Sequence, residues 1–234
     1  MAFSTDHFLN WTDKHGKKQH RILQREYTSL VGDSLDFTKM FFSLAIKNGY
    51  RRYKNTVLIS DGATWIRNMK NYIFPDVQQI LDFYHLKEHV ADYFKQVFNF
   101  NEEHYLKYTE IVCNLFKDSK SIEAIKIIKK LSNKKDKYIL ENILQYIDNN
   151  KDNIDYKNYR LKGYFIGSGA IESSNKTVLQ RCLKYGAMRW NIASAQAVVT
   201  LVAKSRSGLW KTDVVDAVYK QYGDPKAKGF SANK

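Results

Sequence analysis

Asp61, Asp82 and Glu172 are the acidic residues whose positions in the sequence suggest chemistry. Asp61 follows an apolar run at residues 56–60, and Asp82 follows a second expected strand at residues 77–81. Glu172 lies much further along, within the sequence Gly-Ser-Gly-Ala-Ile-Glu. Carboxylates from distant positions can share Mg²⁺ ions, which prefer oxygen ligands and bridge the attacking and leaving oxygens in phosphoryl transfer. We therefore treat Asp61 and Glu172 as a candidate metal-binding and catalytic pair.

Each of these candidates also has a structural interpretation. An acid that ends a strand and precedes a glycine, as Asp61 does, is usually structural or caps a helix. Glu172 is expected in the first turns of a helix, where a negative charge gains about 0.3–1 kcal/mol from the helix dipole. His85, taken alone, is typical of a structural histidine. The residues by themselves leave these alternatives open.

Two short segments predict the elements that position the acids. Residues 56–60 and 77–81 are expected to form buried strands, with a helix between them. Strand, helix and strand in this order indicate a parallel pair joined by a crossover. Parallel sheets bind ligands at the carboxyl ends of their strands, and Asp61 and Asp82 both follow such ends.

The rest of the chain predicts mostly helices. The other expected elements are a hairpin with a basic turn at residues 13–18 and a second strand near 25–31, a helix at 34–48, helices throughout 85–158, and a last helix around 192–204. Just two prolines and no Gly/Ser-rich linker occur, which indicates one continuous globular unit.

Composition favours a polyanionic partner. The 234 residues carry a formal net charge of +14 and 44% are hydrophobic, so the chain can bury a core and bind nucleic acid through counterion release. No apolar stretch approaches the roughly 20 residues that span a bilayer, and the start lacks a signal-peptide pattern. We expect a soluble, intracellular protein. Cys113 and Cys182 lack metal-site spacing, so we expect reduced core cysteines.

The middle of the expected helical region is rich in lysine. Its members are Lys117, Lys120, Lys126, Lys129, Lys130, Lys134, Lys135 and Lys137. These lysines form either a solvated helix face or a surface that binds a DNA backbone. The apolar stripe of the same helices already explains why the helices form, without a role for the lysines.

Two ordered sequence blocks resemble a known family. ISDGATWI at 59–66, FP at 74–75 and ILDFYH at 80–85 are followed by IGSGAIES at 166–173 and GAMRW at 186–190. Together with WTDKHGKK at 11–18, they resemble bacterial insertion-sequence transposases of the ISKra and Mutator-like group, which are enzymes of the DDE type.

The resemblance implies an α/β fold. The expected fold consists of a ribonuclease H-like core, here with incomplete first strands, and an all-α insertion. The expected divisions are residues 1–85 for the first part of the core, 86–160 for the helical insertion, 161–210 for the part of the core with the helix that carries the third acid, and 211–234 for a C-terminal tail.

The resemblance also implies roles for the candidate residues. Asp61 would be the second acid of the triad and Glu172 the third, together holding two Mg²⁺ ions, for which Mn²⁺ can substitute. Asp82 and His85 match an Asp-x-x-His signature that organises the site. Trp190 would stack on a base, although packing in the core is an equal alternative. The candidate DNA-binding residues are Lys17, Lys18, Lys129, Lys130, Lys176, Arg181, Arg189 and Trp190.

The family's first Asp lies upstream of the hairpin, and no residue here matches it. Asp6 and Asp13 lie too close to the hairpin to substitute. Because phosphoryl transfer depends on metal binding and positioning, we expect little or no activity from this chain alone. It would be a truncated transposase that acts on insertion-sequence ends and target DNA in the bacterial cytoplasm, at the nucleoid, as a homo-oligomer when intact. The alternatives are a catalytically inactive DNA-binding remnant of a transposase and an unrelated basic binding protein.

Overall fold

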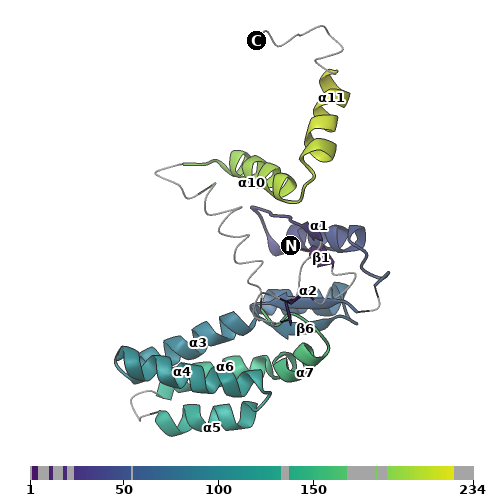
Figure 1. Cartoon of the computed structure of the whole chain (residues 1–234). Coiled ribbons are helices and arrows are strands. Elements are labelled where there is room, and N and C mark those ends of the chain that lie inside the picture. Colours follow the sequence, from purple (N-terminus) through teal and green to yellow (C-terminus); the bar gives the residue numbers. More distant parts are fainter. Residues whose placement is uncertain are drawn as a thin grey trace. The chain divides into compact units, whose positions relative to one another are not determined.

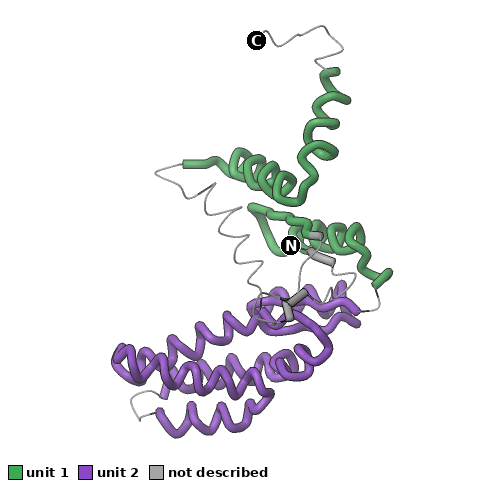
Figure 2. The backbone as a smooth tube through the Cα atoms, in the orientation of Figure 1, with its two compact units in different colours: residues 1–54, 170–234 green, residues 55–169 purple. Residues whose placement is uncertain are grey.

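The chain forms two compact units. The computed structural model describes residues 2–4, 11–12, 18–19, 24–53, 55–132, 137–167, 183 and 189–223. Contacts divide the chain into unit 1, residues 1–54 and 170–234, and unit 2, residues 55–169 (Figure 2). The expectation of one continuous globular unit is therefore wrong. Each unit buries apolar side chains of its own, and such a division needs no linker rich in proline or glycine.

Unit 1 combines short antiparallel strands with helices. Its described elements are β1 (Ala2–Ser4), β2 (Trp11–Thr12), β3 (Lys18–Gln19), β4 (Gln24–Glu26), α1 (Ser34–Lys47), α10 (Ile192–Arg206), the π-helix η4 (Trp210–Val215) and α11 (Asp216–Tyr222) (Figure 1). β1 pairs with β4, and β2 pairs with β3. The antiparallel pairing expected around the basic turn is thus present, and residues 13–17 of that turn lie outside the described part.

The strand expected to continue to Val31 ends earlier. After β4, the Tyr27 N–H donates to Ser207 Oγ at 2.9 Å, and the Val31 N–H donates to Gln196 Oε1 at 2.7 Å. The Gln196 side-chain amide also donates to the Ser29 carbonyl at 3.0 Å. Side chains in α10 and just after it thus satisfy backbone groups that a longer strand would have paired with another strand.

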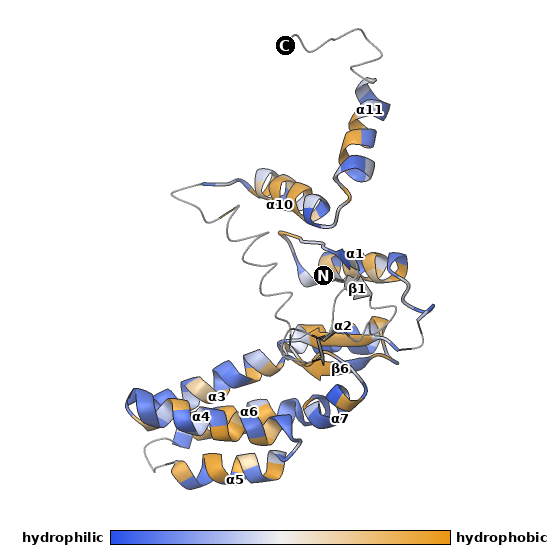
Figure 3. Ribbon diagram, in the orientation of Figure 1, coloured by the Kyte–Doolittle hydropathy of each residue, from blue (hydrophilic) through white to orange (hydrophobic). Residues whose placement is uncertain are grey.

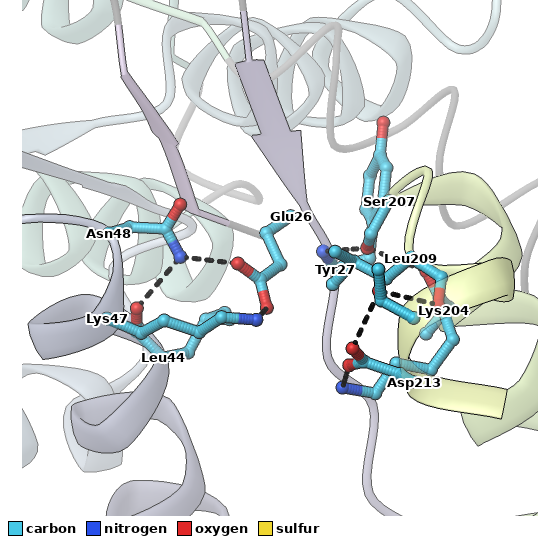
Figure 4. A network of polar contacts seen from close by, with 11 residues as sticks. Glu26, Tyr27, Leu44, Lys47, Asn48, Lys204, Ser207, Leu209 and Asp213 are labelled. Atoms are coloured by element: carbon cyan, nitrogen blue, oxygen red, sulfur yellow. Dashed lines mark hydrogen bonds and ion pairs between the residues drawn. The ribbon is translucent and has the colours of Figure 1, made fainter. Parts of the chain in front are cut away.

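A buried carboxylate joins β4 to the end of α1. Glu26 accepts hydrogen bonds from Lys47 Nζ at 2.6 Å and from Asn48 Nδ2 at 2.9 Å (Figure 4). Lys204 makes a second ion pair with Asp213, and its hydrogen bond lowers the pKa of that carboxyl group. A buried charge is tolerated where it is paired and hydrogen-bonded, as Glu26 is.

Unit 2 contains a small parallel sheet followed by helices. Its described elements are β5 (Val57–Ser60), α2 (Thr64–Ile73), β6 (Gln78–Leu81), α3 (Phe83–Val97), α4 (Glu102–Lys117), α5 (Ser121–Leu131), α6 (Lys137–Asn149), the 3₁₀ helix η2 (Lys151–Asn153) and α7 (Tyr156–Leu161). β5 pairs parallel with β6, which confirms the predicted crossover. The described chain is therefore a mostly helical α/β mixture.

One hydrophobic cluster holds unit 2 together. Leu86, Val90 and Phe94 repeat at intervals of one helical turn along α3, and each is 0% exposed. Phe116 of α4 and Ile128 of α5 belong to the same cluster. Apolar and polar residues both occur along these helices, as Figure 3 shows by colour, so each helix has an apolar face to bury.

The two strands differ in burial. Ile80 and Leu81 of β6 are buried as expected, whereas Val57, Leu58 and Ile59 of β5 are only half-buried. The expectation of two fully buried strands is therefore wrong for β5. In the part of the chain that the structure describes, β5 pairs with β6 alone, so no further strand covers its other edge.

Cys113 meets the expectation of a reduced core cysteine. Cys113 is a free, buried thiol, and burial raises its pKa to about 11, so it stays protonated at neutral pH. Cys182 lies outside the described residues. Among the helices that the structure describes, none combines the length and apolar character needed to cross a bilayer.

Phe94→Ala is predicted to destabilise unit 2 by about 3–5 kcal/mol, because it leaves a cavity where a 0% exposed ring packs against Phe98 and Tyr108. Urea unfolding followed by circular dichroism measures the loss. The control is Phe100→Ala, at a side chain that is 71% exposed, which should change stability by less than about 0.5 kcal/mol. Equal losses in both variants would contradict the assignment of the core.

Candidate functional site

Asp61 and Asp82 leave the parallel sheet at the same edge. Ser60 lies opposite Leu81 in the register of β5 and β6, and each acid is the next residue along its strand. The Asp82 N–H also donates to the Ser60 carbonyl at 2.7 Å, so the pairing extends to the acid itself. The sequence correctly predicted that strand pairing brings these two residues together.

Both acids also take part in local backbone hydrogen bonds. Asp61 Oδ1 accepts from the Ala63 N–H at 2.9 Å, and Asp82 caps α3 by accepting from the Tyr84 N–H at 2.8 Å. Each carboxylate thus accepts a local hydrogen bond, but only Asp82 caps a helix, because α2 begins after Ala63 without a side-chain cap. Asp82 is buried, whereas Asp61 is exposed and offers further lone pairs to a ligand.

Two histidines follow Asp82 on the same helix. His85 Nδ1 lies 3.3 Å from Glu88 Oε2, and the rings of His85 and His89 meet edge to face with centroids 4.8 Å apart. His85 was a predicted site residue, but His89 was missed. Its spacing of one helical turn from His85 was the available signal.

Tyr146 of α6 joins the helices to this edge of the sheet. Its ring stacks on His89 with centroids 4.0 Å apart, and its hydroxyl donates to the main-chain carbonyl of Asp61 at 3.3 Å. Burial, followed by the charges of Asp61 and Asp82, raises the pKa of Tyr146. The phenol therefore remains a donor. Nothing in the sequence separated Tyr146 from the other aromatic residues of the helices.

The second sequence block begins beside Asp82. The Phe83 N–H donates to the Ile166 carbonyl at 2.8 Å. A Cβ on Gly167 would lie 2.5 Å from the Tyr84 ring and 3.7 Å from Asp82 Oδ1. The segment that leads into IGSGAIES therefore passes next to Asp82, and only glycine fits at residue 167 without displacing the Tyr84 ring.

Several predicted site residues lie outside the residues that the structure describes. Glu172, Lys17, Lys176 and Arg181 are not among the described residues, and only the backbone of Lys18 is described, in β3. The pairing of Asp61 with Glu172 therefore stays a prediction. The described residues contain no group of three or more His, Cys, Asp or Glu side chains that could hold a metal ion.

The remaining predicted DNA-binding residues are accessible. Lys129 and Lys130 are exposed in the last turn of α5. Arg189 and Trp190 precede α10 and are exposed, Trp190 by 39%. The choice between base stacking and core packing for Trp190 stays open.

Gly62→Ala is predicted to lower stability by about 2–4 kcal/mol. Gly62 has φ +83°, and an added Cβ would lie 2.8 Å from both Asn150 Oδ1 and Leu81 Cδ1. The matched control is Gly208→Ala, which has φ +72° but no atom within 4 Å of the added carbon, and should cost only about 1–2 kcal/mol. Urea unfolding separates the two, and a Gly62→Ala loss no larger than the control's would argue against close packing at this turn.

The His89 environment predicts a pH dependence. Burial, followed by the charge of His85, lowers the pKa of His89 below 6.5, while Asp92, Glu88 and Asp61 oppose this shift. The folded state thus binds fewer protons than the unfolded chain below pH 6.5. The stabilisation by neutral His89 is complete above pH 6.5 and is lost as the pH falls through the folded pKa.

His89→Gln should therefore weaken the fall in unfolding free energy between pH 7.5 and 5.5. Urea unfolding at both pH values measures this fall. His104→Gln, at an exposed position of α4, is the control and should keep the pH dependence of the unaltered chain. A His89→Gln chain with unchanged pH dependence would show that His89 does not carry the effect.

Comparisons of the chain with protein-family models, with curated proteins and with solved structures found no match. The functional conclusion therefore depends on the residues and their geometry.

Proposed function

We propose that the chain is part of a DDE-type transposase, which cuts and joins DNA at the ends of an insertion sequence. The observation that carries the proposal is the meeting of its two sequence blocks in space. The Phe83 N–H bonds to the Ile166 carbonyl at 2.8 Å, and Gly167 packs against Tyr84 beside Asp82. Segments far apart in the sequence are thus adjacent beside Asp82.

The chemistry assigned to the acids is metal-dependent. Asp61 serves as the second acid of the triad, and its exposed carboxylate has the oxygen donors that Mg²⁺ and Mn²⁺ prefer. Glu172 follows Gly167 by five residues and serves as the third acid. Two bound Mg²⁺ ions would activate the attacking water or DNA hydroxyl and stabilise the leaving oxygen. Asp82 fixes the start of α3 and with it His85.

The order of elements along the chain supports the proposal of a ribonuclease H-like core. The antiparallel pair β1–β4, the parallel pair β5–β6 and the helical block between Asp82 and Ile166 occur in the order that this proposal requires. An inner strand with the first acid would complete the sheet, and the described residues contain no strand on the other edge of β5.

The partner in this proposal is DNA at the insertion-sequence ends and at the target, bound by a homo-oligomer in the bacterial cytoplasm. The net charge of +14 supports binding to DNA phosphates. The exposed Lys129 and Lys130 present charge at the end of α5, where a phosphate backbone can reach them. The same charge supports the second candidate, a DNA-binding remnant without catalysis, because it does not depend on the acids.

Nicking and strand transfer on supercoiled DNA in Mg²⁺ test the proposal. We expect little activity from this chain and clear activity when an upstream strand with an Asp is added. In that extended form, Asp61→Asn or Glu172→Gln should lower the rate at least about a hundredfold, since each removes a metal ligand. The control is Asp92→Asn, an exposed acid of α3, which should leave the rate unchanged.

The outcomes separate the two candidates. A folded extended form that binds DNA without metal-dependent nicking would favour the DNA-binding remnant. Nicking that survives Asp61→Asn would contradict the assignment of Asp61 as a catalytic acid.

A further inference from the structure

We propose that Tyr146 is a positioning residue for Asp61, so that α6 sets the orientation of this acid. The inference rests on the proposed function, because it assigns Asp61 a metal ion to hold. The Tyr146 hydroxyl donates to the Asp61 carbonyl at 3.3 Å, across a sequence separation of 85 residues. Asp61 in turn accepts the Ala63 N–H at 2.9 Å, so the turn after β5 is held by a distant and a local hydrogen bond.

Asn150 lies close to Gly62, the next residue of the same turn. It is 1% exposed, and its Oδ1 lies 2.8 Å from the position that a Cβ of Gly62 would occupy. The Asn150 side-chain amide donates to the Tyr146 carbonyl at 2.8 Å, and its Oδ1 accepts from Arg67 Nη2 at 3.4 Å. The end of α6 therefore packs directly against the turn that carries Asp61.

Tyr146 is itself held in place. Ile143 and Ile147, its neighbours on α6, are buried in the core of unit 2 and fix the rotation of the helix. The Tyr146 ring stacks on His89 of α3 at 4.0 Å. A rigid donor of this kind holds a catalytic group within the narrow geometry that chemistry requires.

This arrangement makes the helical block part of the site. The block begins after Asp82 and returns to Asp61 through Tyr146, so the acid at the end of β5 is fixed by a helix that follows it by some 85 residues of sequence. Loss of the Tyr146 hydroxyl should loosen the Asp61 turn and weaken the binding of a metal ion by Asp61, while the ring still packs on His89.

Tyr146→Phe in the full chain tests the proposal, with Tyr138→Phe as the matched control. Tyr138 lies on the same helix and is 75% exposed. The first measurement is amide hydrogen exchange at Ala63, whose N–H reports the Asp61 turn. We expect about fivefold faster exchange in Tyr146→Phe, the size of one lost hydrogen bond, and no change in Tyr138→Phe. Unchanged exchange in Tyr146→Phe would overturn the proposal.

The second measurement separates positioning from a merely structural contact. Electron paramagnetic resonance gives the Mn²⁺ dissociation constant of each chain, and Asp61→Asn identifies the binding that depends on Asp61. Tyr146→Phe should raise that constant about fivefold. An Asp61-dependent constant that Tyr146→Phe leaves unchanged would overturn the positioning role. If Asp61→Asn changes no Mn²⁺ binding, the proposed function fails, and hydrogen exchange still decides whether Tyr146 holds the turn.

Discussion

The parallel pairing of β5 with β6 is the interaction on which the candidate site depends. Because Ser60 lies opposite Leu81, Asp61 and Asp82 leave the sheet at one edge. A pair of strands is marginally stable by itself. The burial of Ile80 and Leu81 in the helical cluster provides the missing stabilisation. The acids are therefore placed by the same apolar contacts that fold unit 2, and a loss of packing there would displace them.

The helices contribute to the site as well as to its support. α3 is capped by Asp82 and presents His85 and His89 one turn apart, and α6 returns Tyr146 to the Asp61 turn. A region that was expected to be an insertion into the core thus supplies side chains at the sheet edge where Asp61 and Asp82 lie. Because α3 and α6 both contact this edge of the sheet, small changes of packing between them should alter the chemistry assigned to Asp61.

The sequence predicted those parts of the fold that depend on local pattern. Two short segments that end before Asp61 and Asp82, with a helix between them, predicted the parallel strands because the crossover follows from the order strand, helix, strand. The contact of Tyr146 was not predictable, since helical periodicity gives the buried face but not the partner of a residue at its margin. The early end of the strand before Val31 depends on Gln196, a side chain distant in sequence.

The central claim is that Asp61 and Glu172 hold the same metal ions, and paramagnetic broadening by Mn²⁺ tests it most directly. Substoichiometric Mn²⁺ is added to the ¹⁵N-labelled chain, and the backbone amide signals are followed by nuclear magnetic resonance. The account predicts that the signals of Asp61 and Glu172 broaden together at the lowest Mn²⁺ concentrations. Broadening at Asp61 that leaves the Glu172 signal sharp would contradict it.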